Sequence, residues 1–208
     1  MGKVRAVCIS EKRGTQKKNI ESAVFVENWG IEGDAHAGNW HRQISLLSEE
    51  TIAAFKARGA EVTDGAFGEN LVVSGYDFTK FPVGTRFTCK DVVLELTQIG
   101  KECHHGCEIF QKMGECIMPT NGVFAKVLHG GKISVGDEFH VQYRAAVITL
   151  SDTASKGERE DASGAAAEEI VRKEGYEVVF KKIIPDDGDS LTALLCELSD
   201  EDKADLIL

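Results

Sequence analysis

No stretch of this 208-residue chain approaches the roughly 18–20 consecutive apolar residues that a membrane helix needs. The N-terminus also lacks the apolar core of a signal peptide, and the residues after Gly2 do not match a myristoylation site. These absences argue against a membrane partner and predict a cytoplasmic protein. In that compartment the six cysteines are mostly free thiols, metal ligands or catalytic groups, and not structural disulfides.

Basic residues are outnumbered, with 24 Lys+Arg against 34 Asp+Glu and a net charge of −10. Because nucleic-acid binding requires a basic surface that neutralises phosphates, this balance argues against a nucleic-acid partner. The charge is uneven: residues 1–140 carry 16 basic and 18 acidic residues (−2), and residues 141–208 carry 8 and 16 (−8). All six histidines and five of the six cysteines precede residue 141. We therefore predict two domains, residues 1–142 and 143–208.

The first domain has the pattern of a mostly β structure. Short apolar runs rich in β-branched residues alternate with glycines, which is typical of a barrel or a sandwich with a few short helices. The expected strands cover residues 3–9, 23–26, 43–47, 70–73, 85–89, 92–99 and 138–141. A helix is predicted over residues 49–57 with Ser48 as its N-cap, and a second short helix over 122–128.

The second domain changes to a β-α-β-α-β pattern, which indicates a parallel α/β sheet. Strands are expected over residues 145–150, 177–184 and 204–208, with helices over 161–173 and, capped by Ser190, over 191–198. Such domains normally need about 100–150 residues, and only 68 follow residue 140. We therefore expect an incomplete α/β unit, and the alternative is a small three-stranded appendage on the first domain.

Residues 101–107 concentrate reactive side chains directly after the strand predicted over 92–99. Thiolates and neutral imidazoles bind transition metals, and a thiolate can also carry sulfur or act as a nucleophile. A cation at Lys101 or His104 would stabilise the thiolate of Cys103. These three residues are the predicted catalytic group.

Cys107 and Cys116 leave several interpretations open. With Cys103 and a histidine they could bind zinc or an iron–sulfur cluster, although C-x₃-C spacing departs from the usual C-x₂-C of compact zinc sites. They could instead assist sulfur or cofactor chemistry, form a regulatory disulfide, or pack in the core.

The first domain resembles the MOSC domain family, named for the C-terminal part of molybdenum cofactor sulfurase. The matching segments are the Gly33-Asp34-Ala35-His36 turn within 30–38, followed in order by 42–47, 68–71, 82–84, 96–103 and 131–137. The resemblance implies a β-rich barrel-like fold and a cysteine after the strand that carries sulfur or binds molybdenum. Cys103 occupies that position.

The second domain resembles the start of the MogA/MoaB-like molybdopterin-binding fold. Residues 146–155, 161–164 and 183–187 carry this resemblance, which implies adenylylation of molybdopterin with ATP and Mg²⁺ in a complete domain. Asp152 and Asp186 follow the first two strands, where ligands of open α/β sheets bind and where carboxylates suit Mg²⁺. The family's phosphate loop and second acidic motif, which come after its third strand, are absent, so we expect no adenylylation by the chain as given.

The resemblance to the MOSC family also implies a pocket for the molybdenum cofactor, with Mo or W. Because molybdopterin carries a phosphate, Arg42 and His36 are candidate anion ligands, and Ser45 could point the same way. The Asn70 amide could hydrogen-bond the pterin edge, and Glu69 is a weaker candidate that is more often a solvated residue.

The leading functional prediction is molybdenum cofactor biosynthesis or handling, with molybdopterin bound and Cys103 carrying sulfur or binding the metal. A sulfur donor or a molybdoenzyme acceptor protein would then be a partner. The alternatives are a non-catalytic cofactor carrier, a thiol-metal redox sensor that binds zinc or iron, and a molybdenum-dependent oxidoreductase.

Overall fold

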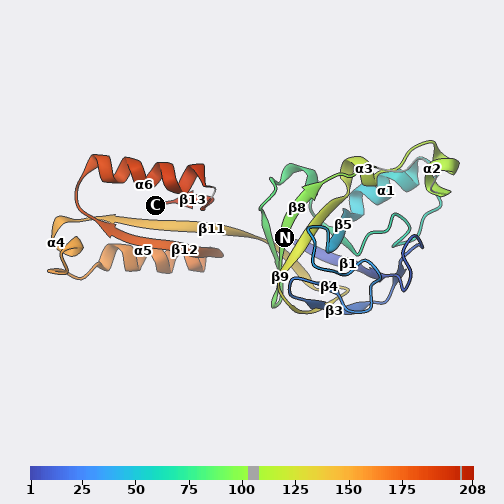
Figure 1. Cartoon of the computed structure of the whole chain (residues 1–208), viewed down its shortest axis with the longest axis horizontal. Coiled ribbons are helices and arrows are strands. Elements are labelled where there is room, and N and C mark those ends of the chain that lie inside the picture. The colour runs from blue at the N-terminus through green and yellow to red at the C-terminus, as the bar shows by residue number, and fades with distance from the viewer. Residues whose placement is uncertain (103–107, 202) are drawn as a thin grey trace. The chain divides into compact units, whose positions relative to one another are not determined.

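The computed structural model describes residues 1–102, 108–201 and 203–208. Within this part, the chain divides into two compact units, Met1–Val141 and Gln142–Leu208, which are described separately (Figure 1). No helix among these residues combines the length and the apolar character needed to cross a membrane.

The strands of unit 1 pair in an order that returns to its starting point. The hydrogen-bonded order is β7 (Arg86–Cys89), β8 (Val92–Ile99), β9 (Val123–His129), β5 (Ile44–Ser48), β6 (Leu71–Ser74) and β1 (Gly2–Ile9). The first residues of β11 (Glu138–Leu150) pair with β1, and β11 is also a neighbour of β7, which closes the circuit. The β5/β6 pair is parallel, and β9 runs antiparallel to both of its neighbours, β8 and β5.

Shorter elements complete unit 1. Strand β2 (Lys18–Asn19) pairs with β1, and a separate three-stranded sheet consists of β10 (Gly131–Ser134), β3 (Ser22–Val26) and β4 (Gly30–Ile31). The helices are α1 (Glu49–Ala57), α2 (Glu108–Met113), α3 (Met118–Asn121) and the 3₁₀ turn Phe78–Lys80.

Two apolar clusters form the core of unit 1. In β8 alternate residues are buried, so that Val92, Leu94 and Leu96 face one side and pack with Phe87 and Phe139. A second cluster lies under α1 and contains Phe55, Phe67, Ile109, Met118 and Phe124. The thiols of Cys8 and Cys89 are buried in these clusters and are not in disulfides.

The predicted helix over residues 49–57 is confirmed. Ser48 is its N-cap, and the Ser48 hydroxyl accepts a hydrogen bond from the Thr51 amide at 3.0 Å. Glu49 and Glu50 in the first turn favour the positive end of the helix dipole. Ile52 and Phe55 form its buried face.

The predicted helix over residues 122–128 is wrong. These residues form β9, which pairs with β8 on one side and β5 on the other. Two neighbouring strands supply backbone partners along the segment, and Val123, Phe124 and Val127 suit a buried strand. The only helix nearby, among the residues that the structure describes, is α3, which ends at Asn121.

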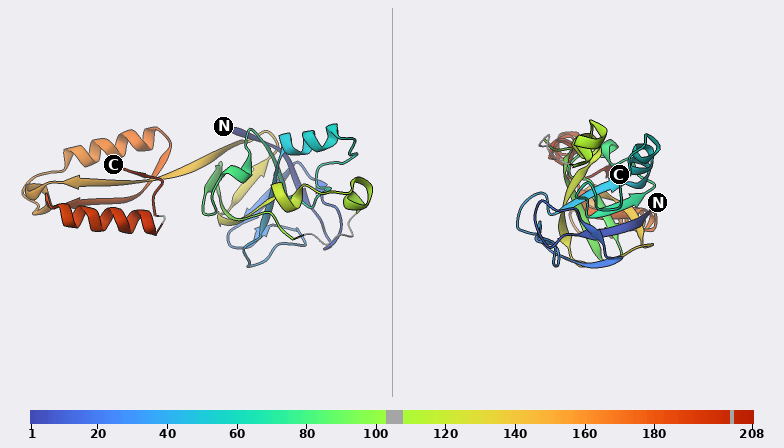
Figure 2. Two further views of the ribbon diagram at one scale, coloured as in Figure 1. Left: turned by 90° about the horizontal axis from the view of Figure 1, so that it is seen from above. Right: turned by 90° about the vertical axis from the view of Figure 1, so that its right-hand side faces the viewer.

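Unit 2 is a three-layer arrangement. The rest of β11 lies between β12 (Tyr176–Ile184) and β13 (Leu206–Ile207), and both pairings are parallel. Helices α5 (Ala162–Lys173) and α6 (Gly188–Asp200) cover opposite faces of this sheet (Figures 1 and 2). Accordingly Ala146 packs with Leu194 on the α6 side, and Ala145 packs with Val171 on the α5 side. The short helix α4 (Asp152–Ser155) follows β11.

The predicted N-cap of the last helix is wrong by three residues. Asp187, not Ser190, caps α6, and its carboxylate accepts a hydrogen bond from the Ser190 amide at 2.9 Å. An aspartate at this position also places negative charge at the positive end of the helix dipole.

Candidate functional site

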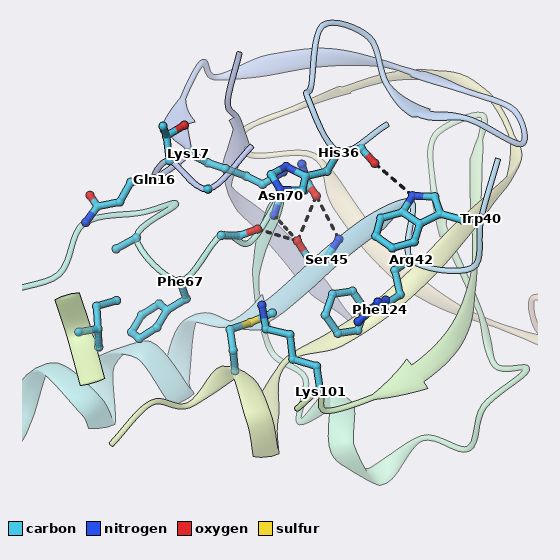
Figure 3. Close-up of a pocket in the computed structure, with 16 residues that line it drawn as sticks. Gln16, Lys17, His36, Trp40, Arg42, Ser45, Phe67, Asn70, Lys101 and Phe124 are labelled. Atoms are coloured by element: carbon cyan, nitrogen blue, oxygen red, sulfur yellow. Dashed lines mark hydrogen bonds between the residues drawn. The ribbon is translucent and has the colours of Figure 1, made fainter. Parts of the chain in front are cut away.

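A cavity of about 550 Å³ lies in unit 1, at one end of β5, β6, β8 and β9 (Figure 3). It is lined by five residues that the sequence singled out, from well-separated parts of the chain: His36, Arg42, Ser45, Asn70 and Lys101. Its volume lies within the usual range for small-molecule sites, about 300–1,000 Å³. The predicted pocket residues are thus neighbours around one hollow.

The charge of the cavity wall is positive. Arg42 and Lys101 line it, together with Lys17, whose charge Asp34 compensates, and none of the described lining residues is Asp or Glu. This is a local reversal of sign in a chain with a net charge of −10. Such a wall favours an anionic ligand, because cationic side chains in a concave, partly apolar site concentrate positive potential.

The Arg42 guanidinium lies between two aromatic rings. Its Cζ atom is 5.0 Å from the centroid of Trp40 and 5.5 Å from that of Phe124. Both distances are within the range of a cation–π interaction. The buried Nε of Arg42 has no hydrogen-bond partner among the described residues. A buried donor without an acceptor is costly, so an incoming anion would satisfy it.

A buried ion pair lies behind the cationic wall. The Lys17 ammonium donates to Asp34 Oδ2 at 2.5 Å, and the two side chains are only 2% and 0% exposed. Burial alone would raise the pKa of the Asp34 carboxyl, but hydrogen bonds from Lys17, Asn70 and the Ser10 amide hold it below its ordinary value. Asp34 is therefore ionised and fixes the position of Lys17.

The Asn70 amide is fully engaged by the protein. Its Oδ1 accepts from the Ser45 amide at 3.1 Å and lies 3.0 Å from the Ser45 hydroxyl. Its Nδ2 donates to the Cys8 carbonyl and to Asp34 Oδ2, each at 3.0 Å. Since a primary amide offers two donors and two acceptor positions, Asn70 acts here as a cross-link between strands at the cavity floor.

His36 presents an uncharged imidazole at the cavity. Burial and then the positive charge of Lys17 lower the pKa of His36, despite Nδ1 lying 3.8 Å from Asp34 Oδ1. That Nδ1 has no hydrogen-bond partner among the described residues. The backbone carbonyl of His36 accepts from Trp40 Nε1 at 3.1 Å, which ties the backbone at His36 to the ring beside Arg42 (Figure 3).

Glu69 does not line the cavity. Its fully buried carboxylate accepts hydrogen bonds from the Gly65 amide at 2.6 Å and the Phe67 amide at 3.0 Å. Burial raises the pKa of Glu69 to about 7, although these amides oppose the rise. The loop that it holds, residues 65–68, contributes three lining residues, so Glu69 shapes the cavity from behind.

In unit 2, Asp152 and Asp186 are adjacent. Asp152 Oδ1 accepts a hydrogen bond from the Asp186 amide at 3.1 Å, where β11 and β12 end. Within the described part of the chain, no group of three or more His, Cys, Asp or Glu side chains is placed to hold a metal ion.

The predicted residues Cys103, His104 and Cys107 lie outside the described residues. Cys116 is described and packs, partly buried, against the cluster under α1. The sequence analysis did not single out Lys17, Trp40 or Phe124, which also line the cavity. A lysine beside a second lysine normally indicates a solvated pair, so only the structure reveals the burial of Lys17.

Comparison with known proteins identifies the families of both units. The family model described as "MOSC domain" matches residues 33–140, and the one described as "Probable molybdopterin binding domain" matches residues 146–208. The crystal structure of the YUAD protein from Bacillus subtilis superposes with a TM-score of 0.59 at 22% identity, covering 68% of this chain and 96% of that one. The crystal structure of YiiM from Geobacillus stearothermophilus gives 0.53 at 16% identity, covering 68% and 75%. At these identities the two structures show the fold alone.

Proposed function

Because the chain belongs to the MOSC domain family and continues into a molybdopterin-binding family domain, we propose that unit 1 binds molybdopterin, as the molybdenum or tungsten cofactor, in the cavity beside Arg42. The observation that carries this proposal is the cationic wall, with its unsatisfied Arg42 Nε, in an acidic protein. We also interpret the closed circuit of strand pairings in unit 1 as a barrel. The domain boundary predicted at residues 142/143 stays a prediction, one residue beyond the division between the two compact units.

Each lining residue has a role that its chemistry allows. Arg42 and Lys101 neutralise the phosphate, and the guanidinium can donate two parallel hydrogen bonds to it. The neutral imidazole of His36 accepts a hydrogen bond from the pterin. Ser45 and Asn70 are hydrogen-bonded to each other and form the floor of the cavity. When bound, the cofactor supplies a metal centre for redox or sulfur chemistry.

The proposed reactive residue is Cys103, two positions after Lys101 in the sequence. A thiolate there would carry sulfur or bind the metal, with Lys101 and His104 stabilising it. Cys107 and Cys116 are assigned to accessory thiol chemistry. A sulfur donor or an acceptor enzyme would be the protein partner.

Two other functions make different predictions. If the protein is a non-catalytic carrier, Cys103→Ala would weaken retention of the cofactor and would change no turnover rate. A thiol-metal redox sensor that uses Cys103, Cys107 and Cys116 would bind zinc or iron tightly and contain no pterin.

The experiment is elemental analysis for Mo, W, Zn and Fe together with pterin fluorescence after oxidation, on anaerobically purified protein. Wild type is compared with Cys103→Ala, with Arg42→Ala and with the control Arg58→Ala. Arg58 also lies over an aromatic ring, 4.9 Å from the centroid of Phe55, but it does not line the cavity. We expect pterin in wild type and in Arg58→Ala, and at least a tenfold loss in Arg42→Ala. Zinc or iron without pterin would overturn the proposal.

A second proposal concerns unit 2 and is supported by the hydrogen bond from the Asp186 backbone amide to the Asp152 carboxylate, which places the two residues side by side where β11 and β12 end. These carboxylates would hold Mg²⁺ and, through it, ATP in a molybdopterin adenylyltransferase-like site. The test is a titration with Mg²⁺ followed by NMR, comparing Asp186→Asn with the matched control Asp189→Asn. Equal affinities in the two variants would contradict the assignment.

A further inference from the structure

Arg42 and Lys101, two cations of the cavity wall, come from segments far apart in the chain. Arg42 lies two positions before β5, and Lys101 lies two positions after β8. Strand β9 lies between these two strands, and in the view of Figure 3 the ring of its Phe124 lies between the two cations. Two long side chains of like charge bind one anion best where the backbone has fixed their spacing in advance, because ordering them otherwise costs entropy.

The side-chain amide of Gln98 links the two segments. Its Oε1 lies 3.0 Å from Nε2 of His41, the residue before Arg42, and its Nε2 donates to the carbonyl of Gly100, the residue before Lys101, at 2.7 Å. A backbone carbonyl only accepts, so the amide nitrogen must face Gly100 and the amide oxygen must face His41. Nε2 of His41 therefore carries a proton and donates it to Gln98.

A β-bulge in β8 directs side chains toward this link. Thr97 is an extra residue in β8, since the residues on either side of it pair with consecutive residues of β9. Bulges re-aim side chains and are common beside functional sites. The Thr97 hydroxyl contacts the His41 carbonyl and lies 3.1 Å from the Phe124 carbonyl. His41 is thus held through both its ring and its backbone.

Each end of the link is fixed to a further part of the cavity. At one end, the backbone amide of Gly100 donates to the Gly122 carbonyl at 2.7 Å, and a Cβ at Gly100 (φ +69°) would clash with the Pro119 carbonyl oxygen. At the other end, the His41 ring packs edge-on against Trp40, with 6.1 Å between centroids. The same Trp40 ring carries the Arg42 guanidinium at 5.0 Å.

We propose that Gln98 and His41 are positioning residues, which set the spacing of Arg42 and Lys101 so that both cations act on one phosphate-sized anion. This inference rests on the proposed function, because it assigns that anion to the cavity. Neither residue lines the cavity, so their effect on the ligand passes through the two cations.

The test uses sulfate, a dianion of phosphate size whose charge does not change near neutral pH, titrated into the full chain and followed by NMR. Gln98→Met keeps the length of the side chain and removes the link, and we expect it to weaken sulfate at least fivefold. The matched control is Gln142→Met, at a half-buried glutamine that does not line the cavity, which should bind sulfate as the wild type does.

Variants of His41 separate positioning from a loss of stability. His41→Phe keeps a ring beside Trp40 but cannot donate, and should weaken sulfate as much as Gln98→Met does. His41→Gln places an amide donor at a similar reach and should bind within twofold of wild type. The double variant His41→Phe/Gln98→Met should lose no more than either single variant, because both remove the same link. Wild-type affinity in both single variants, or losses that add in the double variant, would overturn the proposal.

Two further readouts distinguish this inference from the proposed function. Without any ligand, a long-range ¹⁵N spectrum of the wild type should show the proton of His41 on Nε2, and Gln98→Met should shift the backbone amide signals of both Arg42 and Lys101. A proton on Nδ1 alone, or unshifted amide signals, would overturn the link itself. Sulfate binding that is undetectable in wild type, or unchanged in Arg42→Ala, would count against the anion site and hence against the proposed function.

Discussion

Asp34 holds Lys17 through a contact of 2.5 Å that solvent hardly reaches, since the two side chains are 0% and 2% exposed. Neither residue can be changed alone without leaving an uncompensated group in the interior. Breaking such a pair costs about 3–5 kcal/mol, whereas replacing both partners by apolar groups can be nearly neutral. The pair is thus a part of the site floor that single substitutions should disturb strongly.

The first prediction follows from this pair. Asp34→Asn should lower the free energy of unfolding by about 3–5 kcal/mol, because Lys17 is left buried beside a neutral amide. The double variant Asp34→Asn/Lys17→Met should recover part of that loss, because it removes the uncompensated ammonium while the amide oxygen at position 34 can still accept from the Ser10 amide. Urea unfolding at pH 7 measures both, and equal losses in the single and the double variants would contradict the interpretation.

The second prediction concerns the cross-link made by Asn70. Asn70→Asp replaces the Nδ2 that donates to Asp34 Oδ2 at 3.0 Å by an oxygen, so two carboxylates would meet in the interior. We expect destabilisation of about 3–5 kcal/mol at pH 8 that shrinks at pH 5, where the new carboxyl takes up a proton. Asn70→Ala is the control, since its destabilisation should not depend on pH in the same way.

The third prediction uses the raised pKa of Glu69, about 7 against an ordinary 4.5. A carboxyl whose pKa is raised in the folded state contributes stability that is fully present below pH 4.5 and is lost as the pH rises through 7. The loss is on the order of 3 kcal/mol between these values. Glu69→Gln should remove this slope, although it weakens one of the two amide contacts.

Taking the difference between wild type and Glu69→Gln also cancels the contribution of His36. Its lowered pKa acts in the opposite sense, since its stability contribution is lost as the pH falls. Unfolding free energies at pH 5, 6, 7 and 8 provide the comparison. Parallel curves for the two proteins would show that Glu69 does not titrate in this range.

The fourth prediction compares two glycines with positive φ. A Cβ at Gly65 (φ +88°) would lie 2.3 Å from the Lys17 carbonyl oxygen, whereas one at Gly14 (φ +78°) meets nothing within 4 Å. Gly14→Ala should therefore cost about 1–2 kcal/mol from backbone strain alone. Gly65→Ala should cost more and should also weaken phosphate binding, because the loop at residues 65–68 lines the cavity. Similar thermal unfolding of the two variants would contradict this distinction.

Local signals in the sequence predicted a good part of the fold. The signals for α1 are the cap at Ser48 and the apolar spacing of Ile52 and Phe55. Because all of them lie within one short segment, the bounds of the helix were predicted correctly. Strand β9 was missed because its conformation depends on pairing with β8 and β5, which lie far away in the sequence. Partners of this kind override local preferences and leave little trace in a single segment.

The residues of the site also divide into those that local sequence identifies and those whose role depends on distant parts of the chain. His36 and Arg42 follow a glycine-rich turn that matches a family motif, so they could be named from sequence. The burial of Lys17 could not, because it depends on Asp34 and Asn70 being brought together by the fold. Asn70 was identified as a site residue from the sequence. Only the structure shows that its side-chain amide is fully used in four hydrogen bonds within the protein.

The two buried cysteines of unit 1 have a practical consequence for thiol chemistry. Burial raises the pKa of the Cys8 thiol to about 12 and that of Cys89 to about 11, so neither forms appreciable thiolate at neutral pH. Alkylating reagents attack the thiolate, and these two side chains will stay unmodified until the protein unfolds. Any label taken up by the native protein therefore reports on the other four cysteines. The rate at which Cys8 or Cys89 is alkylated then measures the rate at which the protein unfolds.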